Sequence, residues 1–218
     1  FDNLINEYAK WVVWQIKWQE KRNASIHNME FPFEYRPGQD KLVKGVYQSV
    51  LRQKRLYIEA PTGIGKTISV IFPAVKSMGE NITEKIFYLT AKTITRTVAE
   101  ETFKILSNNG MSLKYITITA KEKICILDKP QCHPATCPRA LGHFDRVNNA
   151  VFDIITHEDN ISRDIILKYS EKYNVCPFEM CLDTAVWADA ITGDYNYVFD
   201  PSASLKRFFA NQKQNNYI

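Results

Sequence analysis

The sequence has 218 residues, 45% hydrophobic and 24% charged, which is the composition of a globular protein with one substantial core and room for a small inserted domain. Its 28 basic and 24 acidic residues give a formal net charge of +4, which is compatible with a nucleic-acid partner but decides little by itself. The longest apolar stretch, Ile68 to Val75, is far shorter than the roughly 20 residues that span a bilayer, and no signal segment opens the chain. We therefore predict no membrane partner.

The five cysteines are an odd number, spread as a group of three and a later pair. This arrangement fits poorly with a disulfide framework and better with a metal site in a reducing compartment, so we expect a cytoplasmic protein. The sequence begins at Phe1 rather than Met and ends in a polar run at Ile218, and we therefore expect a fragment of a longer protein.

The first half of the chain alternates between helical and strand patterns. Residues 4–19 carry apolar side chains at nearly helical spacing, which predicts an amphipathic helix. A turn-rich stretch at 31–38 leads into a second predicted helix at about 39–53. The segment 56–59 predicts a short strand, followed by a glycine-rich loop and an apolar helix through residue 75. Residues 85–90 predict another strand, before a helix that ends near residue 106.

The pattern changes near residue 110. A cysteine- and proline-rich stretch at 125–138 precedes helical segments at about 144–157 and 161–173, and a strand is expected again at about 190–195. Strands that alternate with helices predict an α/β fold with a parallel sheet and flanking helices, here interrupted by a small helical insertion.

The glycine-rich loop has the context of a nucleotide-binding loop, because a strand precedes it and a helix follows it. Such a turn supplies backbone N–H donors and the helix dipole to phosphates. In this interpretation Lys66 neutralises the β- and γ-phosphates and the Thr67 hydroxyl ligates Mg²⁺, which makes these two the catalytic candidates. Ala60 replaces the first glycine of the general motif. The predicted ATP-binding residues of the loop are Ala60, Pro61, Thr62, Gly63, Ile64, Gly65, Lys66 and Thr67.

The Ala-Pro-Thr-Gly-x-Gly-Lys-Thr form of the loop resembles that of superfamily 2 helicases, and Arg36-x-x-Gln39 lies where such helicases place an adenine-reading glutamine. A glutamine amide can pair with both a donor and an acceptor on the edge of the base. We therefore add Arg36 and Gln39 to the predicted nucleotide site.

Four cysteines are candidate metal ligands: Cys125, Cys132, Cys137 and Cys176. Thiolates are soft ligands that suit an iron–sulfur cluster or a structural zinc, and the spacing lacks the tight C-x2-C pairs of most zinc sites. Spacing favours iron–sulfur and leaves zinc open. Cys181 is predicted to be a buried apolar residue, and His133 and His143 are left out of the site.

Several of these motifs together resemble one family. Lys123-Ile-Cys125, the middle cysteines and Cys176-Pro-Phe-Glu are similar to the cluster-binding motifs of XPD/DinG-like superfamily 2 iron–sulfur DNA helicases. The resemblance covers roughly residues 31–209. It also includes Phe31-Pro-Phe-Glu-Tyr-Arg-Pro-Gly-Gln, the phosphate loop, Tyr88-Leu-Thr-Ala-Lys-Thr-Ile-Thr-Arg and Gly193-Asp-Tyr-Asn-Tyr-Val-Phe-Asp-Pro, in the family's order.

The resemblance implies an ATP-dependent helicase or translocase with ATP, Mg²⁺ and a [4Fe–4S] cluster as cofactors. It implies 5′ to 3′ movement on single-stranded or forked DNA, in repair or replication. Its DNA-contacting motif maps onto Thr90, Lys92, Thr93 and Arg96. Lys121 resembles a basic residue of the family that supports the cluster and lies near the DNA, and it completes the predicted DNA-binding set. The first helix and the stretch after Trp18 resemble the linker of bacterial relatives that carry a nuclease domain ahead of the helicase.

The fold that follows is an incomplete RecA-like P-loop motor domain with an iron–sulfur cluster insertion. We expect a helical linker at 1–30, the motor domain at 31–108, the insertion at 109–185 and the continued motor domain at 186–218. No Asp-Glu dipeptide occurs in the sequence, so we expect these residues to bind nucleotide without completing hydrolysis. Two alternatives stay open: a zinc-stapled P-loop ATPase that does not act on DNA, and a non-enzymatic metal-containing nucleic-acid-binding module.

Overall fold

The computed structural model describes residues 2–91, 93–200, 205–209 and 216–218, without the side chains of Asn3, Thr93 and Ile94. The chain divides into two compact units. The first comprises Phe1–Leu113 with Gln212–Ile218, and the second comprises Lys114–Asn211.

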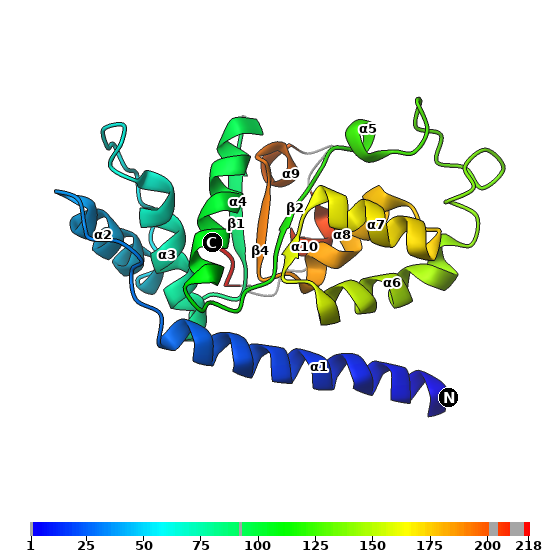
Figure 1. The fold of residues 1–218 in the computed structure, drawn as a ribbon, viewed down its shortest axis with the longest axis horizontal. Coiled ribbons are helices and arrows are strands. Elements are labelled where there is room, and N and C mark those ends of the chain that lie inside the picture. Colours follow the sequence, from blue (N-terminus) through cyan, green and yellow to red (C-terminus); the bar gives the residue numbers. More distant parts are fainter. Residues whose placement is uncertain (1, 92, 201–204, 210–215) are drawn as a thin grey trace. The chain divides into compact units, whose positions relative to one another are not determined.

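Helix α3 (Lys66–Gly79) is the centre of the first unit. It packs against α1 (Asp2–His27), α2 (Gln39–Leu51) and α4 (Thr93–Asn108), and α4 in turn lies along strand β1 (Ile86–Thr90), as Figure 1 shows. Val75, Met78, Phe103 and Leu106 are fully buried in this core. The helices therefore form because their apolar faces can be covered together around α3.

The end of α1 is tied to α3 by one lysine. The last carbonyl groups of a helix have no partner within the helix and must find donors elsewhere. Lys76 provides such donors: its Nζ donates to the carbonyl oxygens of Ile26 and His27 at 3.0 Å each, and to that of Met29, just beyond the helix, at 3.1 Å. These contacts hold the end of α1 against α3, directly before the turn-rich stretch at 31–38.

Residues 216–218 add to the start of β1. Tyr217 forms a parallel bridge with Lys85, the N–H of Ile218 donates to the Lys85 carbonyl at 3.1 Å, and the N–H of Phe87 donates to the Ile218 carbonyl at 2.7 Å. The end of the sequence thus runs alongside β1 as an extended segment.

The second unit contains a parallel sheet in the order β4-β2-β3. Strand β2 (Tyr115–Thr117) lies between β3 (Asn160–Ile161) and β4 (Ala190–Asp194), with Ile116 opposite both Ile161 and Ile191. These three isoleucines are at most 1% exposed, as expected for a parallel sheet that is covered on both faces.

A buried lysine holds the register of this sheet. Lys114, immediately before β2, is 2% exposed, and its Nζ donates to Asp159 Oδ1 at 2.7 Å and to the Glu158 carbonyl at 2.9 Å. Its backbone N–H donates to Asp189 Oδ2 at 2.9 Å. One residue therefore connects the starts of all three strands.

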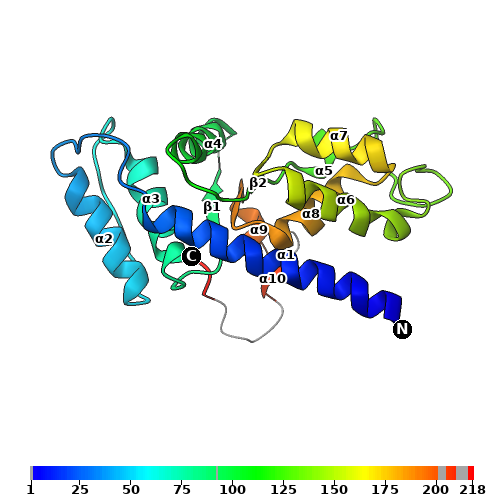
Figure 2. The ribbon, with the colours of Figure 1, turned by 60° about the horizontal axis from the view of Figure 1, so that its bottom comes forward.

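Helices α6 (His143–His157), α7 (Arg163–Tyr173) and α8 (Pro177–Trp187) pack on one another and lie together in Figures 1 and 2. Ser162 caps α7 by accepting a hydrogen bond from the backbone N–H of Ile165. Short helices complete the unit: α5 (Lys121–Ile124), α9 (Asn196–Phe199) and α10 (Lys206–Phe209).

The α/β class with parallel strands and flanking helices is confirmed. The predicted helices of both halves and the strands at 85–90 and 190–195 are present. Helix α1 continues eight residues beyond its predicted end at residue 19, and the other ends differ by a few residues. The four domain ranges stay predictions. No helix in the described ranges combines the length and apolar character needed to cross a bilayer.

The strand predicted at 56–59 is wrong, because residues 54–60 are neither helical nor part of a sheet. A strand is stabilised by hydrogen bonds to a neighbouring strand and by cover for its side chains. Leu56, Tyr57 and Ile58 are instead 45%, 87% and 42% exposed.

Candidate functional site

The phosphate loop turns at two glycines with left-handed backbone conformations. Gly63 has φ +83° and Gly65 has φ +80°, values that side-chain-bearing residues rarely adopt. Gly65 is the N-cap of α3, and its carbonyl accepts hydrogen bonds from the N–H of Ser69 at 3.1 Å and from its hydroxyl at 2.8 Å. The free N–H groups at the start of α3 thus lie directly after the loop, as anion binding requires.

Lys66 is folded onto its own loop. Its Nζ donates to the carbonyl oxygens of Ala60 at 3.0 Å and Pro61 at 2.8 Å, although the side chain is exposed. Backbone carbonyls are weak partners for an ammonium group compared with phosphate oxygens. The lysine can therefore exchange these contacts for a triphosphate, and Thr67 follows it in the first turn of α3.

Arg36 and Gln39 belong to the same cluster as the loop. The Arg36 guanidinium donates to the carbonyl of Gly63, and the Arg36 backbone N–H donates to Gln39 Oε1 at 3.0 Å. Gln39 is 3% exposed, and a Cβ on Gly65 would lie 2.6 Å from its Nε2. The structure brings these predicted residues together, and the Gln39 side chain packs against the loop at Gly65.

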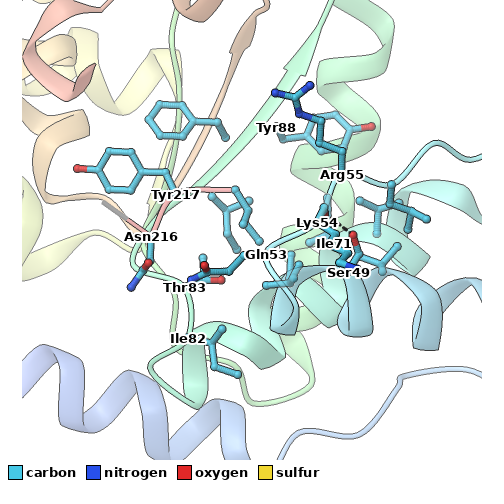
Figure 3. A pocket seen from close by; sticks show the side chains of 18 of the residues that line it. Ser49, Gln53, Lys54, Arg55, Ile71, Ile82, Thr83, Tyr88, Asn216 and Tyr217 are labelled. Atoms are coloured by element: carbon cyan, nitrogen blue, oxygen red, sulfur yellow. Dashed lines mark hydrogen bonds between the residues drawn. The ribbon is translucent and has the colours of Figure 1, made fainter. Parts of the chain in front are cut away.

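A separate pocket of ≈ 630 Å³ lies in the first unit, between α2, α3, β1 and residues 216–218 (Figure 3). Its lining is mostly apolar and includes the exposed Leu56 and Ile58. Ser49 lies at one side of it, with its hydroxyl donating to the Lys54 carbonyl at 2.6 Å. Of the predicted nucleotide, metal and DNA residues that the structure describes, none lines this pocket.

Two of the four candidate ligand cysteines are brought near the start of α8. Cys176 is the N-cap of α8, and Cys132, on the loop after α5, lies 3.7 Å from Lys121 Nζ through its sulfur. The same ammonium group lies 4.9 Å from the centroid of the Phe178 ring and 3.9 Å from the Glu179 carboxylate. Lys121 therefore connects the cysteine loop to the beginning of α8.

The environment of Cys176 acts on its thiol in two directions. Burial raises the pKa of the Cys176 thiol, while the backbone N–H groups of Glu179 and Phe178 favour the thiolate and oppose that rise. A sulfur at a helix N-terminus is well placed to carry the negative charge that a metal ligand needs.

The four sulfurs are not gathered into one site. Cys125 ends α5 and is half-buried, Cys132 is exposed, and Cys137 is 7% exposed. Within the described residues, no group of three or more histidine, cysteine, aspartate or glutamate side chains is arranged to hold a metal ion. Four thiols are a donor set that fits the chemistry of an iron–sulfur or zinc site. Because the structure does not bring the four sulfurs together, their role as ligands stays a prediction.

The prediction for Cys181 is confirmed. It is 1% exposed, its S–H faces the Thr117 carbonyl at 3.9 Å, and burial raises the pKa of its thiol to about 12. His143, which sequence reasoning set aside, is also buried and accepts a hydrogen bond from the N–H of Cys176. No sequence signal distinguishes His143 from an ordinary core histidine, because its contact with Cys176 joins residues 33 positions apart.

The DNA-binding candidates fall in both units. Thr90 ends β1 and is half-buried, as is Arg96 in the early part of α4. Lys92 and the side chain of Thr93 lie outside the described residues. Lys121 begins α5 beside the cysteine loop.

The α/β fold and the glycine loop at the start of α3 define a P-loop domain of the superfamily 2 helicase type. A family model described as "Type III restriction enzyme, res subunit" matches residues 32–164, more than half of the sequence, and the chain belongs to this family.

Among solved structures, an XPD helicase matches with a TM-score of 0.54 at 15% sequence identity. The match covers 85% of this chain and 32% of the helicase chain, so the chain spans about a third of that protein. The predicted RecA-like fold is thereby confirmed, and the chain is similar in fold to an XPD helicase. No curated protein sequence matches the chain.

Proposed function

We propose that the chain is the nucleotide-binding part of an ATP-dependent DNA helicase or translocase. The observation that carries this proposal is the phosphate loop: two left-handed glycines place a lysine and the N-terminus of a 14-residue helix around one anion site. Membership of the family supports it, because the matched residues 32–164 include the whole loop.

Each residue of the loop has a defined role in the proposal. Lys66 leaves the carbonyls of Ala60 and Pro61 to neutralise the β- and γ-phosphates, and the Thr67 hydroxyl ligates Mg²⁺. Arg36 and Gln39 hold the loop in shape from the side and contact the adenine when ATP is bound. Because these residues contain no Asp-Glu pair to hold Mg²⁺ and activate water, nucleotide binding without full turnover is the activity expected of them.

The proposed nucleic-acid partner is single-stranded or forked DNA, tracked 5′ to 3′ in repair or replication. Hydroxyl and basic side chains bind the phosphates of a single strand without reading its sequence. The proposed set combines both kinds: Thr90, Lys92, Thr93, Arg96 and Lys121. A cytoplasmic location and a nuclease domain ahead of Phe1 are part of the same proposal.

The proposed metal group is a [4Fe–4S] cluster held by Cys125, Cys132, Cys137 and Cys176. When bound, such a cluster supplies a covalent crosslink between the loop after α5 and the start of α8. The protein's contribution is the Lys121 ammonium beside Cys132 and the backbone N–H groups of α8 beside Cys176, which stabilise negatively charged sulfur.

Binding of a non-hydrolysable ATP analogue with Mg²⁺ tests the nucleotide site. Lys66→Ala is expected to weaken binding by about 1.5–3 kcal/mol, the value of a charged hydrogen bond, which corresponds to roughly 10- to 150-fold. Lys104→Ala, an exposed lysine of α4 in the same unit, serves as the control and leaves binding unchanged. Absence of analogue binding in the unaltered chain would instead favour a non-enzymatic nucleic-acid-binding module.

Determination of iron, acid-labile sulfide and zinc in anaerobically purified protein tests the metal group. We expect about four iron and four sulfide per chain, lost when Cys125 or Cys176 becomes Ser. Stoichiometric zinc without iron would contradict the cluster and favour a zinc-stapled P-loop ATPase.

A further inference from the structure

The segment that follows Cys137 is hydrogen-bonded to the segment that leads into Cys176. Arg139 makes the first of these contacts: its Nη1 donates to Ser170 Oγ at 2.9 Å, to the Ser170 carbonyl, and to the Val175 carbonyl at 3.4 Å. Val175 is fully buried directly before Cys176. Arg139, two residues after Cys137, thus holds the backbone both within the last turn of α7, at Ser170, and just after the helix, at Val175.

Arg146 makes the second contact, at the C-terminus of α7. Asn174 turns the chain there with φ +52°, and the last carbonyls of the helix need donors from outside it. Arg146 Nε donates to the Tyr173 carbonyl at 3.1 Å, and its Nη2 donates to the Asn174 carbonyl at 2.8 Å. Gly142 leaves room for this side chain, because a Cβ there would lie 2.5 Å from Arg146 Nη1.

His143 makes the third contact, with Cys176 itself. The first residue of α6, it is 3% exposed, and its Nδ1 accepts the backbone N–H of Cys176 at 3.2 Å. A nitrogen that accepts carries no proton, so in the neutral imidazole Nε2 carries it. Nε2 is buried and has no hydrogen-bond partner within the described part of the chain.

The unpartnered Nε2 makes a plain packing role for His143 a poor explanation. A buried polar group without a partner costs free energy, and a leucine at this position would fill space without that cost. The contact that offsets the cost is the one made by Nδ1. His143 is therefore placed to fix the backbone at which α8 begins.

We propose that Arg139, His143 and Arg146 form a clamp that positions Cys176 for metal binding, with His143 as the positioning residue that holds its backbone. The clamp rests on the proposed function, which assigns Cys176 as a ligand. It ties the segment after Cys137 to the start of α8 through protein contacts alone. The loop after α5, with Cys125 and Cys132, supplies the other two proposed ligands.

Three substitutions of His143 separate this role from packing. The Asn side-chain oxygen occupies the position of Nδ1, so His143→Asn keeps the acceptor, whereas His143→Gln moves it further from the backbone and His143→Leu removes it. Release of iron to a chelator is expected to be unchanged in the Asn variant and about 10-fold faster in the Gln and Leu variants. His157→Ala, an exposed histidine at the other end of α6, is the matched control with no change.

Amide hydrogen exchange of Cys176 in metal-free protein tests the clamp without the cluster. We expect protection of this N–H in the unaltered chain and the Asn variant, and its loss in the Leu variant while amides in the core of α6 stay protected. Equal protection in all variants, or equal iron release, would overturn the clamp and leave the cluster proposal standing. If the Cys176 N–H is protected in the unaltered chain and the Asn variant but not in the Leu variant, and the protein binds neither iron nor zinc, the cluster proposal is overturned. The hydrogen bond between His143 and Cys176 then still stands.

Discussion

The phosphate loop and the cysteine region are built in opposite ways. The loop collects its polar groups from the eight consecutive residues 60–67, because two glycines turn the backbone around one point. The cysteine region extends from Cys125 to Cys176, and its parts are held by side chains of 139–146 and by the packing of α6, α7 and α8. Local geometry thus forms the turn of the first site, which Arg36 and Gln39 only support from outside, whereas the second site depends throughout on tertiary contacts.

The largest expected effect tests the local character of the loop. Gly65→Ala forces a side chain into left-handed backbone and against Gln39, so we expect a loss of about 2–4 kcal/mol in the free energy of unfolding. Gly63→Ala meets nothing within 4 Å and should cost only the backbone strain, about 1–2 kcal/mol. Urea unfolding measures both, and equal losses would show that Gln39 moves aside.

The next effect tests the tertiary character of the second unit. Lys114→Met removes the donors to Asp159 and to the Glu158 carbonyl, and we expect a loss of about 1–3 kcal/mol by urea unfolding. The matched control is Lys168→Met, whose exposed ammonium lies 3.9 Å from the Glu158 carboxylate and should contribute less than about 0.5 kcal/mol. Similar losses would mean that the buried lysine does not set the register.

A pH effect distinguishes the buried cysteine from the candidate ligands. Burial raises the pKa of Cys181 from 9.0 to about 12, so the folded protein keeps a proton that the unfolded chain releases. This contribution is fully present below pH 9.0 and is lost as the pH rises toward 12, at up to about 1.4 kcal/mol per pH unit. Unfolding across this range should depend less on pH in Cys181→Ala; an unchanged slope would contradict a buried thiol.

The smallest expected effect concerns DNA. If Lys121 contacts one phosphate, Lys121→Ala lowers the slope of log affinity against log salt by about 0.7 for single-stranded DNA. Lys123→Ala, exposed on the same short helix, is the control. A slope that stays constant while iron is lost faster would restrict Lys121 to the cysteine region.

The same contrast explains what the sequence predicted well and where it failed. Arg36, Gln39 and the loop were predicted to share one site from their resemblance to helicase motifs, and the structure brings them together. The strand at 56–59 failed because strand formation depends on a neighbour, which the local pattern of Leu56 and Ile58 does not report.

The sequence by itself determined the α/β class and the glycine loop, and it predicts the thiol donors. These follow from glycines, periodic apolar residues and cysteines, whose effect on the backbone or chemistry is local. Only the tertiary structure decided that His143 holds Cys176, that Lys114 joins three strands and that Lys121 reaches Cys132. The contacts of Lys114 and His143 join residues 33 to 75 positions apart and are at least partly buried, which strengthens them by removing water that would otherwise compete. The contact of Lys121 with Cys132 is exposed and spans 11 positions, so it depends on the path of the loop between them.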